Sequence, residues 1–315
     1  MNPISALFGL GVASRNALYD RELIGRQRLK APVVSIGNIS VGGTGKTPFA
    51  IALGQLLLER SVRLDVLSRG YRRRSEGVQI AGSDADPDVV GDEPALIASR
   101  LGVPVIVAAR RAEGGRAAEE KFGSQLHLLD DGFQHRQLAR QFDIVLLSPS
   151  DMEDRLLPFG RLREPVASLR RADAVVVDES FTPRLPDFAG KLWRTRRKLV
   201  IGSAPKRPVV FCGIAKPQQF FQMVSHAGVA PATTVTFRDH HRYTENDLQE
   251  LRRKATQTGA DGFLTTEKDA VKLRRLPALA GLSVVRLEVE LLEAAPAVEH
   301  LMATLGQRCP GWFRG

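Results

Sequence analysis

Short apolar runs rich in β-branched residues alternate with longer stretches in which apolar residues recur at helical spacing. The runs cover residues 33–37, 62–67, 103–107, 126–129, 142–147 and 174–177. The first helical stretch, residues 49–60, comes soon after the first run. Strands and helices that alternate in this order predict an α/β fold built on a parallel sheet.

A change in composition divides the chain into two unequal parts. Residues 183–208 are rich in proline and arginine, and we interpret them as a linker with additional strands. Residues 31–182 before the linker are expected to form the core domain. Residues 209–315 after it are expected to form a smaller α/β lobe, with a strand at 233–237 and a helix starting near Glu245.

The first 30 residues, 1–30, are predicted to form a separate N-terminal helix. Residues 2–14 are uncharged and include several large apolar side chains, but a bilayer crossing takes about 20 apolar residues. No basic residue precedes this stretch as in a secretory signal, and five basic residues follow it before residue 31. Two interpretations remain open: the helix lies on an anionic membrane surface, or it packs on its own domain.

The overall composition and charge narrow the function classes. The chain has two distant cysteines, Cys212 and Cys309, which argue against a disulfide framework or a structural zinc site and fit a reducing cytoplasm. The net charge of +10 favours an anionic partner: nucleic acid, acidic lipid or a phosphorylated substrate. Aromatic residues make up only 6%, which counts against a nucleic-acid-binding groove. No obligate protein partner is evident.

A glycine-rich segment between the first strand and the first helix predicts a phosphate-binding P-loop. Its candidate nucleotide-binding residues are Gly42, Gly43, Thr44, Gly45, Lys46 and Thr47. The glycines let backbone N–H groups converge on phosphate oxygens, Lys46 reaches the β and γ phosphates of ATP, and the Thr47 hydroxyl suits Mg²⁺. The strict motif has a glycine where this chain has Ser40.

Acidic residues follow two further elements of the predicted core. Asp130 and Asp131 end the run at 126–129, and two adjacent carboxylates at a strand end are suited to Mg²⁺. Asp92 and Glu93 open a predicted helix. There they either stabilise the helix N-terminus or act as a general base or metal ligand beside the P-loop.

Three other loops carry reactive side chains. Arg69 follows the run at 62–67, at a strand end where ligand sites of α/β proteins gather. Arg163 lies in a loop bounded by proline and glycine that is suited to holding an anion. His240 and His241 stand beside charged residues just before a helix, which favours a site residue over a structural histidine.

Taken together, these motifs resemble one family, tetraacyldisaccharide 4′-kinase, the P-loop kinase of lipid A biosynthesis. The similarity runs in order from Gly37 to Leu273. The matching segments are GNISVGGTGKTP, LSRGYRRR, VGDEPALIA, LDDGFQHRQLARQFDIVLL, LLPFGRLREP, FCGIAKPQQFF, FRDHHRYT and TTEKDAVKL. The loop of this family also lacks the first glycine of the strict motif, so Ser40 agrees with the resemblance.

The resemblance implies a P-loop NTPase core, with ATP and Mg²⁺ as cofactors, and transfer of the γ-phosphate to the 4′-hydroxyl of an acylated disaccharide 1-phosphate. It implies a peripheral enzyme on the cytoplasmic leaflet of a bacterial inner membrane, with no nucleic acid as partner. It assigns acid/base catalysis to Asp92 paired with His240, and places Glu93, Asp130 and Asp131 among acidic and metal-handling positions. It makes Arg163 a phosphate or substrate contact.

Asp92 and His240 fall in different predicted lobes, so lobe closure is expected to assemble the site. Two rival functions remain open at this point. One is a P-loop kinase acting on another phosphorylated small molecule, and the other is a nucleic-acid-binding ATPase.

Overall fold

The computed structural model describes residues 3–70, 76–185 and 187–312. In these ranges the strands are β1 (Val33–Asn38), β2 (Leu64–Ser68), β3 (Gln79–Ala81), β4 (Val105–Val107), β5 (Leu126–Asp130), β6 (Phe142–Leu146), β7 (Ala174–Asp178), β8 (Lys191–Ile201), β9 (Val209–Cys212), β10 (Thr233–Thr236), β11 (Phe263–Thr266) and β12 (Leu282–Leu291). The helices are α1 (Pro3–Asp20), α2 (Lys46–Leu58), α3 (Pro87–Val90), α4 (Asp92–Leu101), α5 (Arg111–Phe122), α6 (Pro217–His226), α7 (Glu245–Thr258), α8 (Glu267–Leu273) and α9 (Ala294–Arg308). Short 3₁₀ turns occupy Pro149–Asp151 and Val166–Arg171.

The strands of the described residues form one continuous, mostly parallel sheet in the order β10-β9-β11-β12-β8-β7-β6-β1-β5-β2-β4-β3. In the core, β1 lies between β5 and β6, and all three are buried along their whole length. Continuous apolar runs are typical of parallel strands covered on both faces. The predicted α/β class with a mostly parallel sheet is confirmed.

Helices cover both faces of the core sheet. Apolar side chains of α2, α4 and α9 pack against one face, whereas α5 packs against the other through Ala112 and Ala118. Because β1, β5 and β2 are parallel, their carboxyl ends lie together at one edge of the sheet, where ligand sites of α/β proteins form.

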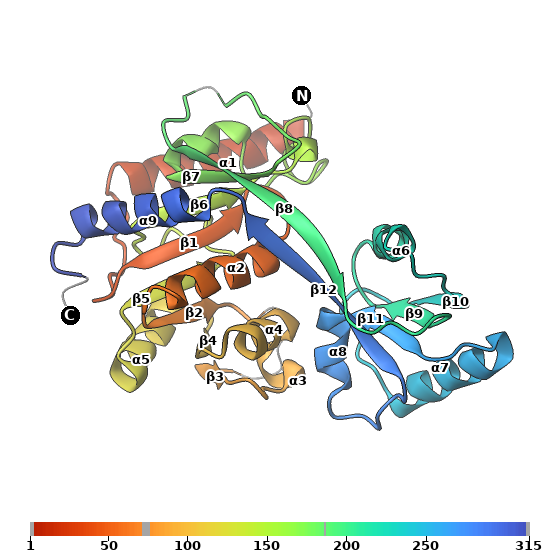
Figure 1. The fold of residues 1–315 in the computed structure, drawn as a ribbon. Helices are drawn as coiled ribbons and strands as arrows, with labels where there is room; N and C mark the ends of the chain where they lie inside the picture. Colours follow the sequence, from red (N-terminus) through yellow and green to blue (C-terminus); the bar gives the residue numbers. More distant parts are fainter. Residues whose placement is uncertain (1–2, 71–75, 186, 313–315) are drawn as a thin grey trace.

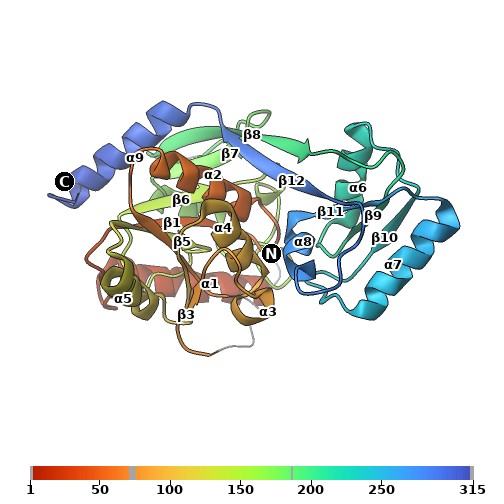
Figure 2. The same ribbon diagram turned by 60° about the horizontal axis from the view of Figure 1, so that its bottom comes forward.

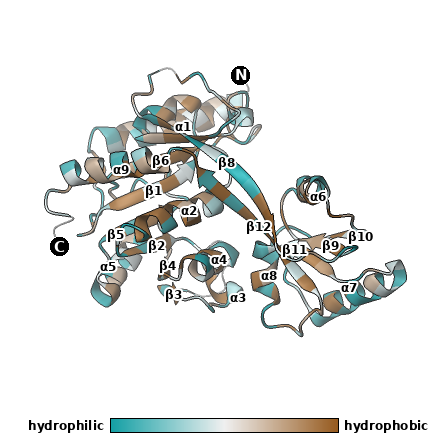
Figure 3. Cartoon of the chain, in the orientation of Figure 1, coloured by the Kyte–Doolittle hydropathy of each residue, from teal (hydrophilic) through white to brown (hydrophobic). Residues whose placement is uncertain are grey.

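The two lobes are joined by β8 and β12, which lie side by side as an antiparallel pair and extend between the core and the second lobe (Figure 1). The second lobe contains β9, β10, β11 and helices α6, α7 and α8. Its core is built from side chains such as Phe211, Leu248 and Leu251. The middle of β8 is hydrophilic, in contrast to the apolar β1 (Figure 3).

The structure differs from the expected boundaries in two places. The segment 183–208, expected as a linker with additional strands, does contain a strand, β8, but β8 pairs with β7 on one side and β12 on the other, so much of the segment belongs to the main sheet. Helix α9, expected in the smaller lobe, packs on the core through Val298, Leu301 and Leu305. Helix α9 accordingly lies on the core, away from the second lobe (Figures 1 and 2). Strand β12 returns the chain to the core, which local sequence patterns do not reveal.

Of the two interpretations left open for the N-terminal helix, packing on its own domain is observed for one side of α1, and the membrane interpretation stays a prediction. Its Asn16 is buried and donates a hydrogen bond to Glu164 at 2.8 Å, so one side packs on the core. On the other side, Leu7 is 71% exposed and Leu10 is 64% exposed. Within the described ranges, every helix falls short of the length and hydrophobicity that a membrane crossing needs.

A buried ion pair connects β2 and β5 beneath the site edge. The Nδ1 atom of His127 donates to Asp65 Oδ2 at 2.8 Å, and both side chains are fully buried. Burial by itself lowers the pKa of His127, but the hydrogen bond and charge of Asp65, together with those of Glu119, raise it overall.

We predict that His127→Leu lowers the free energy of unfolding by about 3–5 kcal/mol, because it leaves the Asp65 carboxylate buried without its partner. The double variant with Asp65→Leu should recover much of this loss. Since the folded pKa of His127 is raised, its stabilisation should be complete below about pH 6.5 and decline as pH rises through the folded value. Urea unfolding across pH 6–9 measures both effects; an unchanged pH dependence in His127→Leu would contradict the assignment.

Candidate active site

The phosphate loop connects β1 to α2 at the carboxyl edge of the sheet. Gly42 and Gly45 have φ angles of 119° and 89°, a region that glycine enters readily and other residues rarely adopt. At Gly37, an added β-carbon would lie 2.6 Å from Cβ of Phe133, so the turn after β5 passes directly beside β1. Lys46 is the first residue of α2, with Thr47 next in the same turn.

Ser40, in place of the motif's first glycine, is buried and forms a β-bridge with Leu162. The neighbouring N–H of Val41 donates to the carbonyl of Arg161 at 2.7 Å. An extended residue therefore suits position 40, because a second loop pairs with the chain there. The same pairing brings Arg163 to the phosphate loop.

Asp131 is held by two cations. Arg163 Nη1 donates to Asp131 Oδ2 at 2.8 Å, and Lys46 Nζ lies 3.4 Å from Oδ1. Lys46 also donates to Oδ1 of Asn38, a residue at the end of β1 that sequence analysis did not single out. Burial by itself raises the pKa of Asp131, but the charges of Lys46 and Arg163 lower it overall. Asp131 is therefore an ionised partner that orients both cations.

Asp130, the last residue of β5, has a different environment. Burial and the negative charges of Glu93 and Asp131 raise its pKa well above the usual range for an aspartate. Its Oδ2 accepts a hydrogen bond from Ser68 Oγ at 3.3 Å. Where neighbouring negative charges raise the pKa of a carboxylate, a bound cation offsets their repulsion and binds favourably.

Basic side chains lie beside these carboxylates. Arg69 follows β2, as predicted, and Arg111 opens α5. Burial and the charge of Arg69 lower the pKa of Arg111 to about 10, although Asp131 and Asp130 act in the opposite direction. Sequence analysis did not single out Arg111 as a site residue. The remaining part of the LSRGYRRR segment, 71–74, falls outside the described residues.

Asp92 and His240 come from different lobes and meet. His240 Nδ1 lies 2.9 Å from Asp92 Oδ2, in the contact expected from the resemblance. Asp92 is the first residue of α4, where the helix dipole favours a negative charge. Burial by itself raises the pKa of Asp92, but the hydrogen bond with His240 and the charges of Lys272 and Lys268 lower it overall. The carboxylate is therefore ionised at neutral pH.

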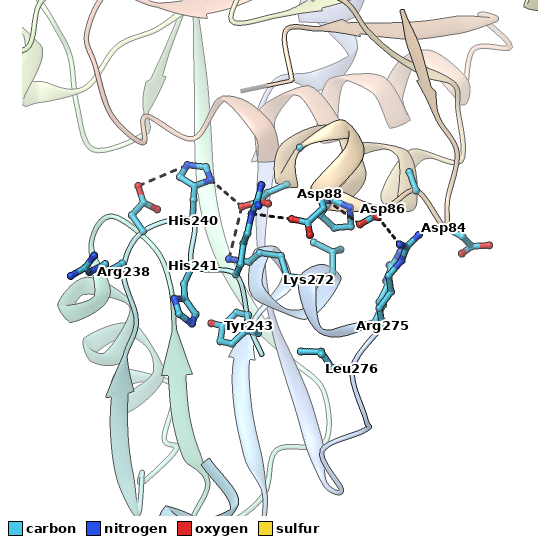
Figure 4. A pocket seen from close by; sticks show the side chains of 18 residues that line it. Asp84, Asp86, Asp88, Arg238, His240, His241, Tyr243, Lys272, Arg275 and Leu276 are labelled. Carbon is cyan, nitrogen blue, oxygen red and sulfur yellow. Dashed lines mark hydrogen bonds and ion pairs between the residues drawn. The ribbon is translucent and has the colours of Figure 1, made fainter. Parts of the chain in front are cut away.

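The turn between β10 and α7 determines which histidine faces Asp92. His241 Nε2 lies 3.2 Å from Asp247 Oδ2, and its ring stacks on Phe237 with centroids 4.7 Å apart. His240 has a left-handed φ of 58°, and its N–H donates to the carbonyl of Gly213. Figure 4 shows the two imidazoles pointing to different sides of the turn. The structure thus favours His240 as the partner of Asp92.

Two lysines of α8 complete the surroundings of this pair. Lys272 Nζ lies 3.9 Å from Asp92 Oδ2. Lys268 Nζ lies 3.4 Å from His240 Nε2 and 3.5 Å from Glu93 Oε1. Sequence analysis quoted their segment, TTEKDAVKL, only within the resemblance and gave it no role. The lysines act from the second lobe, so only the tertiary structure reveals their position.

A cavity of about 790 Å³ opens beside Asp92 and His240, between α3, α4 and the second lobe (Figure 4). Ligand sites commonly have volumes of about 300–1,000 Å³. Its lining is largely charged: Arg242 contacts Asp88 at 3.0 Å, and Arg275 contacts Asp86 at 2.6 Å. Such a cavity suits a polar ligand better than an acyl chain.

Comparison with known proteins identifies the family. Residues 1–306 match the LpxK family, described as tetraacyldisaccharide-1-P 4′-kinase. The chain belongs to this family. A tetraacyldisaccharide 4′-kinase from Koribacter versatilis is 48% identical over 98% of this chain and 99% of its own length. One from Aquifex aeolicus is 36% identical over 86% of this chain and 89% of its own length.

A solved structure agrees with this assignment. The crystal structure of an "apo" form of LpxK from Aquifex aeolicus in complex with ATP superposes with a TM-score of 0.81 at 32% identity. It covers 96% of this chain and 97% of the crystallised chain. The resemblance drawn from the sequence motifs is therefore confirmed, together with the P-loop kinase fold that it implied.

The acidic residues of this LpxK family member fit a magnesium ion. Among the described residues, no three His, Cys, Asp or Glu side chains are grouped as a set of metal ligands. Mg²⁺ is usually held by only one or two carboxylates together with substrate phosphates and water. Burial and neighbouring negative charges raise the pKa of Asp130, and Glu93 contacts one lysine, Lys268, whereas Asp131 is paired with both Lys46 and Arg163. We therefore infer that Asp130, with Glu93 and Thr47, would hold the ion.

We predict that Asp130→Asn raises the Mg²⁺ concentration needed for half-maximal ATP binding by roughly tenfold or more. Asp131→Asn is the matched control, because it removes the same charge from a carboxylate engaged by Lys46 and Arg163. Calorimetric titration of ATP at several Mg²⁺ concentrations measures the shift without turnover. Equal Mg²⁺ shifts in the two variants would contradict this division of roles.

Proposed function

We propose that this protein transfers the γ-phosphate of ATP to the 4′-hydroxyl of a tetraacyldisaccharide 1-phosphate at the cytoplasmic face of the inner membrane. The single observation that carries the proposal is the 2.9 Å contact of Asp92 with His240. It joins an ionised carboxylate at the start of α4 to a side chain of the second lobe. The family assignment supplies the identity of the acceptor.

Asp92 is suited to act as the general base. A sugar hydroxyl is a weak nucleophile, so a group must accept its proton as the new P–O bond forms. His240 and Lys272 both contact Oδ2 of Asp92, which leaves Oδ1 for the acceptor hydroxyl. A proton on His240 Nδ1 satisfies Asp92, and Nε2 can then accept a hydrogen bond from Lys268. His240, in the tautomer that carries its proton on Nδ1, thus orients the carboxylate of Asp92.

The cationic residues act on the phosphates. Asp131 pairs with both Lys46 and Arg163. Lys46 lies at the start of α2, directly after the phosphate loop. Arg163 is brought to the loop because its neighbour Leu162 pairs with Ser40. Charges that are held in place before the reaction stabilise the transferred phosphoryl group without reorganisation. When bound, Mg²⁺ would be held by Asp130, Glu93 and Thr47 and would supply further positive charge to offset the charge of the phosphates.

The exposed apolar side of α1 supports a location at the membrane surface. Leu7 and Leu10 lie on the same helix as Ile4, which is 56% exposed, and the nearby loop carries Phe159 at 54% exposure. The loop and helix are in contact, because Ser5 Oγ donates to the carbonyl of Leu156 at 3.1 Å. An apolar patch on a protein with a charge of +10 favours an anionic lipid surface.

We predict that the wild-type protein moves label from γ-labelled ATP into the glycolipid acceptor, and that Asp92→Asn lowers kcat by roughly 10²–10⁴ with little change in ATP affinity. His240→Ala should also lower kcat. The double variant should lose far less than the product of the two single effects, because the pair acts as a unit.

His241→Ala is the matched control, since His241 contacts Asp247 and its loss should leave kcat close to wild type. Absence of label in the glycolipid would refute the proposed function. Fully multiplicative losses in the double variant would refute the pairing alone.

We predict that Leu7→Ser with Leu10→Ser weakens binding to anionic vesicles by about tenfold or more, because each leucine contributes apolar area to the lipid contact. Val200→Ser changes an exposed apolar residue on β8 and serves as the control. Vesicle sedimentation at low and high salt measures the effect, and added salt should weaken binding further. Equal binding by the wild type and the leucine variant would show that this face does not meet the lipid.

A further inference from the structure

Arg197 of β8 lies against the phosphate loop, although sequence analysis did not single it out as a site residue. Its Nη2 donates to the carbonyl oxygen of Thr44 at 3.0 Å. Its guanidinium also covers Gly45, where an added β-carbon would lie 3.3 Å from Nη2 and 3.6 Å from Cζ. The catalytic arrangement proposed above uses neither contact.

The bond to Thr44 has a consequence for the phosphate loop. In a trans peptide the carbonyl and the following N–H point in opposite directions. A Thr44 carbonyl turned towards Arg197 therefore turns the N–H of Gly45 away from Arg197. Loops of this kind bind phosphate through converging backbone N–H groups. Gly45 has a φ of 89°, and a glycine at this position lets the adjoining peptide rotate more easily than another residue would.

We propose that Arg197 is a positioning residue that holds the Thr44–Gly45 peptide in the orientation that offers its N–H to the nucleotide phosphates. The inference rests on the proposed function, because it assumes that the loop binds ATP. The hydrogen bond has a charged donor, which makes it stronger than a bond between neutral groups. The contact also attaches the loop to β8, the strand that pairs with β12 and continues into the second lobe.

The neighbouring residue provides a matched control. Arg196 carries the same charge on the same strand, but its guanidinium pairs with Glu179 at 2.5 Å. Successive side chains of a strand point to opposite faces, which explains why only one of the two reaches the loop. Arg196→Ala therefore removes an equal charge from β8 without touching the phosphate loop.

The experiment measures direct binding of ATP and ADP, each with Mg²⁺, to wild type, Arg197→Ala, Arg197→Lys and Arg196→Ala. We expect Arg197→Ala to raise the Kd for ATP and for ADP by the same factor, about tenfold or more, because both nucleotides use the loop N–H groups. Arg197→Lys keeps a charged donor and should recover part of the affinity. With ATP saturating, kcat of Arg197→Ala should stay near wild type, which places the defect in binding. Arg196→Ala should match wild type throughout.

Four results would overturn the inference. A loss confined to ATP would mean that Arg197 acts as a direct charge on the γ-phosphate. Unchanged affinity for both nucleotides, or an equal loss in Arg196→Ala, would remove any special role for Arg197. Thermal melting of each variant shows whether a lower affinity comes from a general loss of folding. A wild-type protein without nucleotide affinity would overturn the proposed function itself and this inference with it.

Discussion

One hydrogen bond, between Asp92 at the start of α4 and His240 in the second lobe, depends on nearly every other feature of the fold. The two residues are 148 positions apart, and each is useful only when its lobe is correctly placed. The placement comes from β8 and β12, whose antiparallel pairing carries the sheet from one lobe to the other. Helix α9 then fixes the end of β12 on the core by burying Leu301 and Leu305. The β8–β12 strand pair thus sets the geometry of the proposed catalytic pair.

The carboxylates at the sheet edge are distinguished by their neighbours rather than by their chemistry. Asp131 is surrounded by Lys46 and Arg163 and has a lowered pKa, whereas adjacent Asp130 faces Glu93 and has a raised pKa. Asp92 is ionised because His240 and the lysines of α8 offset its burial. Three similar side chains can therefore serve as cation clamp, metal ligand and base. This division follows from which cation lies closest to each, since a charge interaction strengthens steeply as distance falls in a buried site.

The lipid nature of the proposed acceptor relates helix α1 to the active site. In the proposed function the lipid acceptor stays in a membrane, and the protein would bring the edge of the sheet that carries its active site to the membrane surface. Buried Asn16 and Glu164 attach α1 to the loop that also carries Arg163, while Leu7 and Leu10 face outward. The proposed lipid contact and a proposed phosphate contact are therefore linked through the packing of α1 on this loop. This arrangement would hold the active site at a constant distance from the lipid head groups.

The sequence by itself determined the parallel α/β core, the phosphate loop with Lys46, and the ordered motifs that indicated the family. These features depend on local periodicity and on residues adjacent in the chain, which short segments encode. Only the tertiary structure decided that β8 joins the sheet, that α9 returns to the core, and that His240 rather than His241 faces Asp92. It also brought Arg197 to Thr44, 153 residues away. Contacts of this kind arise from the packing of distant elements, so no local pattern can specify them.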